Sequence, residues 1–335
     1  MTPELQRPPT ATIPVSSHTG CSTWTATTGA PDAPRHDPMT RVPDTAIDEL
    51  RTVGFTRVDG FLTQGELAAI AEPLADEVPT REAYHAAPER YTHLVETQFT
   101  GNFKFPYSHL ELNRLAYHPD LIDAAERFHG TTDIDLYKVE LWAKYSGAID
   151  YEQRLHRDYG NHTMLVPRTD GAWPQMTTIL LLSDVTKKDG PTMAVPLSAS
   201  RNIPMHVRHA LRREYPALYL SQVPLVGPAG TLYIYRTDVF HRGSSMKGHE
   251  RARFIYMADY KARGTSWQGK MAWPNTALNE HWGAVLADAS PRQREIFGIP
   301  APGHEYWNEQ TMTDVQGRWP GWDMTPYRAA LVDER

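Results

Sequence analysis

Apolar and polar residues alternate along much of the chain beyond residue 133, and this two-residue period is typical of β-strands. The longest such run covers residues 135–145. Shorter runs follow it, and turn-forming sequences such as Asp189-Gly190-Pro191 separate several of them. The pattern predicts five further strands, at residues 153–166, 175–183, 191–196, 231–235 and 251–260. One helix, at about 204–214, is predicted between the third and fourth of them.

A helical period precedes this β-rich region. Thr63-Gln64-Gly65-Glu66 is a capping-box sequence, and apolar residues then recur at helical spacing, which predicts a helix over 64–77. Pro119 at a first helical position and Gly130 at a helix end predict a second helix over 119–129. Residues 44–50 and 54–58 are predicted to form a short helix and a strand.

These patterns predict a mainly β protein with flanking helices, built on a double-stranded β-helix of the jelly-roll, cupin-like type. Residues 44–262 would form that domain. Residues 1–43 are rich in Pro, Thr, Ser and Ala and are expected to be a disordered tail. Residues 263–335 are rich in Trp and are expected to pack on the barrel, either as support alone or also as a wall of the substrate pocket.

The composition indicates which kinds of binding partner and which cellular location to expect. The 335-residue chain has a net charge of −6 and no basic run, so neither nucleic acid nor an anionic membrane is an expected partner. No apolar stretch approaches the roughly 18 residues that span a bilayer, and the N-terminus lacks a secretory-signal pattern. The single cysteine, Cys21, excludes an intrachain disulfide framework. We expect a cytoplasmic protein, monomeric or homodimeric, that acts on a small molecule.

Pairs of a histidine and a carboxylate are the candidate metal-binding residues of this sequence. The sequence has three His-x-Asp/Glu pairs, which begin at His109, His118 and His156. Only His156 and Asp158 lie in a strand-like run, where residues two apart point to the same face. On a regular strand His162 would share that face and Arg157 would point away from it.

A second stretch could complete a metal site. His241 follows the predicted strand 231–235, and two histidines with one carboxylate form the facial triad of non-haem Fe(II) oxygenases. Arg251 and Arg253 begin the next strand, where a guanidinium could bind a dicarboxylate such as 2-oxoglutarate. Residues that flank these strands are candidate pocket residues, although ordinary barrel packing explains them equally well; they are Trp142, Tyr145, Gln153, Asn161 and Thr178.

Together, the His-x-Asp pair, the turn at Asp189-Gly190-Pro191, His241-Arg242-Gly243-Ser244 and the following arginine resemble the phytanoyl-CoA dioxygenase family. That family comprises Fe(II)- and 2-oxoglutarate-dependent oxygenases, and the resemblance covers roughly residues 46–262. It implies that His156, Asp158 and His241 bind iron. The family usually has His-Gly-Ser where this chain inserts Arg242.

The resemblance also implies the reaction and the contacts with the co-substrates. The enzyme would use 2-oxoglutarate and O2 to hydroxylate an acyl-CoA or another small metabolite, with release of succinate and CO2. Arg253 would bind the distal carboxylate of 2-oxoglutarate, Arg251 is the alternative, and Ser244 matches a hydroxyl that contacts 2-oxoglutarate in relatives. Halogenating relatives have a small residue at the position of Asp158, so its presence favours hydroxylation.

Two other functions remain open at the level of the sequence. One is a jelly-roll protein that binds a metal or ligand without turnover. The other is a zinc hydrolase that uses the same three ligands and needs neither O2 nor 2-oxoglutarate.

Overall fold

The computed structural model describes residues 40–94, 100–102 and 105–332. Most of the predicted tail, residues 1–39, lies outside the described residues. Its last part is packed against the folded chain, because Val42 is fully buried and its carbonyl accepts a hydrogen bond from Arg127 Nη2 at 2.7 Å.

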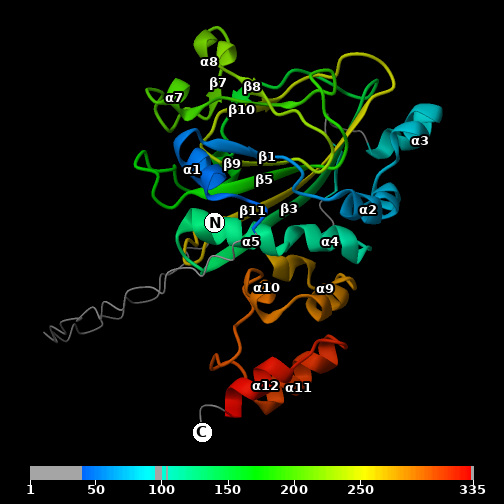
Figure 1. Cartoon of the computed structure of the whole chain (residues 1–335), viewed down its shortest axis with the longest axis vertical. Coiled ribbons are helices and arrows are strands. Elements are labelled where there is room, and N and C mark those ends of the chain that lie inside the picture. The colour runs from blue at the N-terminus through cyan, green and yellow to red at the C-terminus, as the bar shows by residue number, and fades with distance from the viewer. Residues whose placement is uncertain (1–39, 95–99, 103–104, 333–335) are drawn as a thin grey trace, which may run out of the picture. The chain divides into compact units, whose positions relative to one another are not determined.

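Two antiparallel sheets form the centre of the fold (Figure 1). The six-stranded sheet has the order β1 (Phe55–Val58), β9 (Leu232–Arg236), β5 (Gln175–Leu181), β11 (Ala252–Ala262), β3 (Ile134–Tyr145) and β2 (Thr100–Asn102). The five-stranded sheet has the order β7 (His209–Ala210), β4 (Leu155–His156), β10 (His241–Gly243), β6 (Thr192–Ala194) and β8 (Val223–Pro224). The predicted fold class, mainly β with flanking helices, is confirmed.

Helices occupy the segments around these sheets. Those before β3 are α1 (Asp44–Thr52), α2 (Gln64–Glu77), α3 (Arg81–Ala86), the 3-10 helix η1 (Pro88–Leu94), α4 (Leu110–Ala116) and α5 (Pro119–His129). Short helices interrupt the β region, namely α6 (Tyr159–His162), α7 (Leu197–Ser200) and α8 (Pro216–Leu220). After β11 come η2 (Trp273–Thr276), α9 (Trp282–Asp288), α10 (Pro291–Glu295), α11 (Glu309–Arg318) and α12 (Thr325–Val332). Among the described helices, none has the length and apolar character needed to cross a membrane.

Local sequence signals set the ends of the two longest helices before the sheet. In α2 the Thr63 hydroxyl accepts a hydrogen bond from the Glu66 amide, and the Glu66 carboxylate accepts one from the Thr63 amide. In α5, Pro119 is at the start and Gly130 ends the helix with a φ of 69°, which glycine adopts without steric cost. Both predicted ranges, 64–77 and 119–129, are confirmed.

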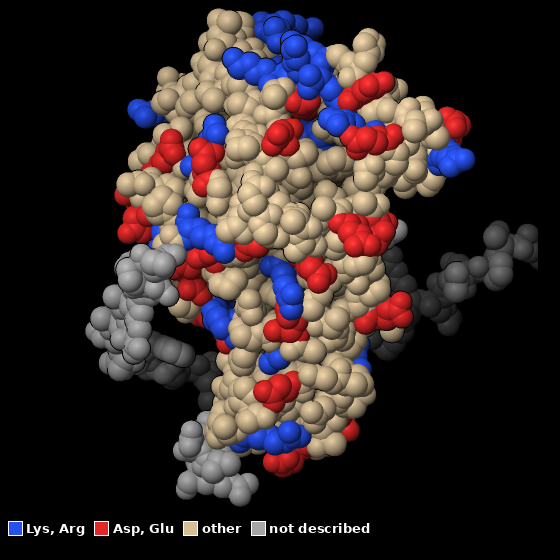
Figure 2. Space-filling view, turned by 45° about the vertical axis from the view of Figure 1, so that its right-hand side comes forward, with Lys and Arg blue, Asp and Glu red and all other residues tan. Residues whose placement is uncertain are grey.

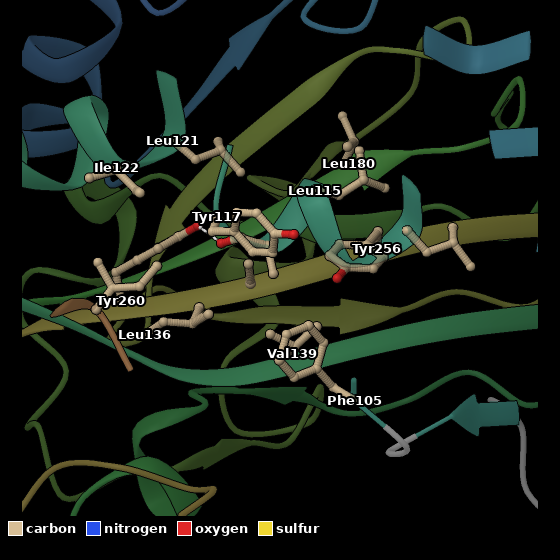
Figure 3. Close-up of a cluster of buried hydrophobic side chains, with 14 of the residues drawn as sticks. Phe105, Leu115, Tyr117, Leu121, Ile122, Leu136, Val139, Leu180, Tyr256 and Tyr260 are labelled. Atoms are coloured by element: carbon tan, nitrogen blue, oxygen red, sulfur yellow. Dashed lines mark hydrogen bonds between the residues drawn. The ribbon is translucent and has the colours of Figure 1, made fainter. Parts of the chain in front are cut away.

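Strand β11 separates the main core from the inside of the barrel. Its Phe254, Tyr256 and Tyr260 face the helices, where Tyr260 donates to the Ala116 carbonyl. Figure 3 shows this core, in which side chains from α4, α5, β3, β5 and β11 point toward one another. Ile255 and Met257 face the other way, into a smaller apolar cluster between the sheets. One face of β11 thus packs against the main hydrophobic core, and the opposite face points into the space between the two sheets.

Two predicted elements are wrong. Residues 204–214 form turns and β7 instead of a helix, because the Arg157 guanidinium donates to the Pro204, Met205 and Val207 carbonyls, which a helix would need for its own hydrogen bonds. The predicted strand 153–166 is reduced to β4 followed at once by α6. The chain turns at Asp158, whose φ of −71° and ψ of −23° are helical.

The segment after β11 contacts the rest of the fold through an aromatic cluster around Phe105. The Phe105 ring lies 5.3 Å from the ring of Trp273, 5.6 Å from that of Trp282 and 6.1 Å from that of Phe297. The Trp273 indole also donates to the Leu136 carbonyl in β3 at 2.8 Å.

Phe105→Ala is therefore expected to lower the free energy of unfolding by about 3–5 kcal/mol, as for other large core aromatics. Phe105 is 1% exposed, so its removal would leave a cavity among these rings. Urea unfolding followed by tryptophan fluorescence measures the change. Leu278→Ala is the control, because Leu278 is 98% exposed and its loss should cost less than about 0.5 kcal/mol. Equal effects of the two substitutions would contradict the packing described.

Candidate metal centre

His156, Asp158 and His241 come together where β4 and β10 pair in the five-stranded sheet. His156 in β4 and His241 in β10 are a directly opposed cross-strand pair, and their rings lie 4.5 Å apart. Asp158 follows β4 and precedes α6, so the turn there brings its carboxylate back toward both imidazoles. Within the described parts of the chain, these residues form the one group of three or more potential ligands that could hold a metal ion.

The spacing of the three groups fits a single ion. Asp158 Oδ1 lies 3.6 Å from His156 Nε2, and Asp158 Oδ2 lies 3.3 Å from His241 Nε2. Ligand atoms in adjacent octahedral positions, each about 2.1 Å from an ion, would be about 3 Å apart. A small contraction of the observed group would therefore give three ligands on one face of an octahedron.

Hydrogen bonds orient both imidazoles for ligation. His156 Nδ1 lies 2.9 Å from the Arg154 carbonyl, and His241 Nδ1 lies 3.1 Å from the Val239 carbonyl. A carbonyl only accepts, so each Nδ1 carries a proton, and the neutral form of each imidazole has its lone pair on Nε2. Both Nε2 atoms face Asp158, which is the arrangement that metal-binding histidines need.

The protonation states of His156 and Asp158 also suit ligation. Burial, together with the nearby His241, lowers the pKa of His156 to about 4, which leaves that imidazole neutral at neutral pH. Burial disfavours the charge on Asp158, but His241 and the other nearby imidazoles hold its pKa well below the usual value. Burial also disfavours a charged His241, but the Asp158 carboxylate outweighs burial and raises the pKa of His241. The carboxylate is thus ionised, and it attracts positive charge to the position that a cation would take.

Tyr235 supports the carboxylate from β9. Its hydroxyl donates to Asp158 Oδ2 at 2.8 Å, and burial raises its pKa well above the ordinary value, so it stays protonated. This hydrogen bond fixes the rotation of the carboxylate relative to the two imidazoles.

Tyr235→Phe is expected to weaken Fe(II) binding by about tenfold, because partners of metal ligands contribute on this scale. Metal affinity can be measured anaerobically by competition with a chromophoric chelator. Tyr233→Phe is the matched control, since the Tyr233 hydroxyl on the same strand donates to the Val226 carbonyl at 2.6 Å and touches no ligand. Unchanged affinity in Tyr235→Phe would show that the hydroxyl does not orient Asp158.

A cavity of about 210 Å³ lies beside the triad, between the two sheets. Of the candidate pocket residues, Trp142, Gln153 and Asn161 line it, and so does His162. His162 reaches the cavity from α6 and not from a strand. Tyr145 and Thr178 are not among the lining residues, and their hydroxyls donate to the carbonyls of Pro79 and Ala258. Arg157 points away from the cavity, as predicted, and donates to the Asp238 carbonyl at 3.0 Å.

The two candidate arginines have different surroundings. Arg253 lines the cavity with the triad and is 3% exposed, and its Nη1 donates to the Gly190 carbonyl. Arg251 precedes β11 and pairs with Asp189 at 2.5 Å, in a separate hollow of about 460 Å³ that contains none of the triad. Ser244 does not line the cavity, and its hydroxyl donates to the Pro191 carbonyl at 2.6 Å. The structure therefore groups Arg253 with the candidate metal ligands and separates Arg251 and Ser244 from them.

Charged residues opposite the triad are absent from the sequence-based set. Lys138 and Glu140 of β3 line the cavity, as does Lys270 beyond β11. Part of the signal was present, because Lys138, Glu140 and Lys144 are charged and are separated by even numbers of positions along the predicted strand. The alternation alone does not indicate that this polar face lies inside the barrel.

The other two His-x-Asp/Glu pairs have structural roles. His118 caps α5, and its Nδ1 accepts a hydrogen bond from the Asp120 amide at 3.2 Å. His109 precedes α4, and its Nε2 lies 2.8 Å from Asp76. Neither pair contributes to a metal-ligand group.

Comparison with known proteins identifies the family of this fold and site. A family model described as phytanoyl-CoA dioxygenase (PhyH) matches residues 50–253. The structure of the epimerase SnoN in complex with Fe3+, alpha ketoglutarate and nogalamycin RO is 19% identical, with a TM-score of 0.51 over 68% of this chain and 86% of that chain. The apo structure of EctD from S. alaskensis is 15% identical, with a TM-score of 0.52 over 70% of this chain and 84% of that chain. No curated protein matches the sequence, and at these identities the structural likeness shows the fold alone.

Proposed function

The chain belongs to the phytanoyl-CoA dioxygenase family of Fe(II)- and 2-oxoglutarate-dependent oxygenases, and from this premise we propose that it hydroxylates a small organic substrate with release of succinate and CO2. The observation that carries the proposal is that a two-histidine, one-carboxylate group and the buried cation Arg253 share one cavity. A metal site alone would serve a hydrolase equally well. A fixed guanidinium beside it is what a dicarboxylate co-substrate requires.

In this proposal His156, Asp158 and His241 would hold the iron, with the co-substrates as its further partners. Bound iron supplies the place where O2 and 2-oxoglutarate react, and with it the oxidising power that acts on a substrate C–H bond. The protein holds the ligands through hydrogen bonds that are already made, from Tyr235 to Asp158 and from each Nδ1 to a backbone carbonyl. Little reorganisation is then needed when the metal binds.

Arg253 has the properties of an anchor for the distal carboxylate of 2-oxoglutarate. Burial lowers its pKa to about 10, which still leaves it charged at neutral pH. Its hydrogen bond to the Gly190 carbonyl holds the guanidinium in place, and the planar charge of a guanidinium is suited to a carboxylate. A co-substrate held at both ends has one orientation at the metal.

Hydroxylation is the expected outcome at this centre. Asp158 occupies the ligand position that is small in halogenating relatives, so a halide would lack a site. Both sheets contribute side chains to the lining of the cavity, and Lys270 adds one from beyond β11.

The proposal is tested by incubating the purified protein with Fe(II), ascorbate and 2-oxoglutarate in air and measuring succinate. We expect succinate formation that requires both Fe(II) and O2 and that a suitable substrate accelerates. A protein that binds metal without turnover would form no succinate. A zinc hydrolase would consume neither 2-oxoglutarate nor O2, and either result would contradict the proposal.

A further inference from the structure

Hydrogen bonds hold the chain on both sides of Asp158. Before it, Arg157 Nε donates to the Asp238 carbonyl at 3.0 Å. After it, the Tyr159 amide donates to the Thr237 carbonyl at 3.3 Å. Both carbonyls belong to the turn between β9 and β10, so the two segments that carry the candidate metal ligands are bonded to each other.

The same turn orients His241. The Val239 carbonyl lies 3.1 Å from His241 Nδ1 and accepts a hydrogen bond from it. Three consecutive carbonyls, those of residues 237–239, thus bond in order to the residue after Asp158, to the residue before it and to His241. Consecutive peptide groups of an ordered turn have fixed relative positions, because each peptide unit is planar. These bonds therefore set where the Asp158 carboxylate lies relative to the His241 imidazole.

Arg157 also binds a third segment, the loop of residues 203–207 between α7 and β7. Its guanidinium donates, at 2.9–3.4 Å, to four carbonyls of this loop, namely those of Ile203, Pro204, Met205 and Val207. The Tyr159 hydroxyl donates to the Met205 carbonyl at 2.6 Å, so both neighbours of Asp158 bond to the loop as well. A guanidinium can join two segments in this way because its N–H groups point in several directions within one plane. A lysine ammonium has its three donors on one atom.

The Arg157 side chain is enclosed between these segments. It is 2% exposed, and its guanidinium carbon lies 4.1 Å from the centroid of the Phe240 ring, in a cation–π contact. Phe240 immediately precedes His241 and is fully buried. Arg157, which lies between His156 and Asp158 in the sequence, is therefore also packed against the neighbour of the third candidate ligand.

Ion pairing does not explain the burial of Arg157. The Asp238 carboxylate pairs with Arg236 at 2.6 Å, and the five acceptors of the Arg157 guanidinium among the described residues are all backbone carbonyls. Residues 201–213, around the loop, include four arginines and no Asp or Glu. In Figure 2, Lys and Arg side chains gather at the top, the end that carries β7, α7 and α8 in Figure 1. Because a buried charge without a counter-ion is costly, the shape of the guanidinium is the better reason for an arginine here.

Building on the proposed function, we infer that Arg157 is a positioning residue for the iron, which holds Asp158 and His241 at the separation that one ion requires without touching the metal or the co-substrates. The candidate ligands come from two segments that are distant in the sequence. Without the contacts of Arg157, ordering these segments would add to the cost of metal binding, and the affinity for iron would fall.

Arg157→Lys tests the inference, because lysine keeps the positive charge but cannot reach both segments. We expect the affinity for Fe(II) to fall about tenfold or more, as for other groups that orient metal ligands. Anaerobic competition with a chromophoric chelator measures this affinity on the metal-free protein, without turnover. Urea unfolding of the same samples shows whether the variant is folded in the assay. A folded Arg157→Lys protein with the wild-type affinity for Fe(II) would overturn the inference.

Arg127→Lys is the matched control for a merely structural arginine. Arg127 in α5 is 6% exposed, donates to the Val42 carbonyl at 2.7 Å and pairs with Asp123 at 2.6 Å, and it contacts no candidate metal ligand. Both variants should lower the free energy of unfolding, but only Arg157→Lys should bind Fe(II) more weakly. An equal loss of Fe(II) affinity in the two variants would show that general destabilisation is the cause, and would overturn the inference.

Tyr159→Phe decides the matter if Arg157→Lys does not fold. This nearly isosteric change removes only the hydrogen bond to the Met205 carbonyl, so we expect Fe(II) to bind about threefold more weakly, on the scale of one neutral hydrogen bond. Tyr260→Phe is its control, because the Tyr260 hydroxyl donates to the Ala116 carbonyl at 2.6 Å, among the helices. In that case, an unchanged affinity in Tyr159→Phe would overturn the inference.

The inference can fail separately from the proposed function. If the wild-type protein binds Fe(II) and forms succinate while a folded Arg157→Lys protein binds Fe(II) as tightly, the role of Arg157 is wrong and the oxygenase activity stands. If the wild-type protein does not bind Fe(II), the proposed metal site is wrong and the inference fails with it.

Discussion

Replacing His241 with alanine is expected to remove bound iron and to lower Fe(II)-dependent succinate formation at least about 100-fold, more than the loss of a partner of a metal ligand would cost. His241 is 6% exposed, and its Nε2 faces Asp158 at 3.3 Å, so no water-exposed side chain can take its place without rearrangement. The substitution leaves His156 and Asp158 as a pair, which binds a divalent ion far more weakly. Iron content after desalting and the rate of succinate formation are the two measurements.

His249→Ala is the matched control for this prediction. His249 is exposed and lines the separate hollow around Arg251, away from the triad. This variant should keep both iron and activity. Retention of iron and activity by His241→Ala, with an unchanged unfolding curve, would show that the metal lies elsewhere.

Replacing Arg253 with glutamine is expected to raise the KM for 2-oxoglutarate by about 100-fold, which corresponds to the loss of a bidentate, charge-assisted contact of about 3 kcal/mol. Gln can keep a hydrogen bond to the Gly190 carbonyl, so the substitution mainly removes the charge. Succinate formation at varied 2-oxoglutarate concentration gives KM and kcat separately. The iron content should stay unchanged, because Arg253 is not a ligand.

Arg251→Gln separates the two candidate arginines. Arg251 pairs with Asp189 and does not line the cavity, so its loss should change this KM less than about threefold. A large effect in Arg251→Gln with a small one in Arg253→Gln would assign the co-substrate to the other arginine. The sequence could not show which of the two arginine side chains faces the cavity, since residues two apart on a strand face the same way. In the structure β11 begins at Ala252, so Arg251 lies before the strand and outside this rule.

Elements with strong local signals could be predicted from the sequence. The capping box at Thr63, the proline at position 119 and the long alternation before Tyr145 each act over a few residues, and the corresponding elements have the predicted type. The helix expected at 204–214 failed because its carbonyls are taken by Arg157, which is distant in the sequence. Tertiary hydrogen bonds of this kind leave no local pattern.

The three candidate metal ligands could be singled out by residue type and spacing, and the structure brings them together, although the local structure assumed for them was partly wrong. Asp158 shares a site with His156 because the chain turns at the end of β4, and not because a strand continues through it. The pairing of His156 with His241 depends on the register between β4 and β10, which cannot be predicted from the sequence pattern alone. The charged wall of Lys138 and Glu140 was missed because alternation predicts a strand but does not say which face meets water.

An anaerobic titration of the metal-free protein with Fe(II) and 2-oxoglutarate tests the central claim most directly, because it reports on the metal site and the co-substrate together before any substrate is known. The account predicts a visible charge-transfer band that saturates at one Fe(II) and one 2-oxoglutarate per chain, that is absent in His241→Ala, and that needs much more 2-oxoglutarate in Arg253→Gln. Failure of the wild-type protein to form this band at saturating Fe(II) and 2-oxoglutarate would contradict the assignment as a 2-oxoglutarate-dependent oxygenase.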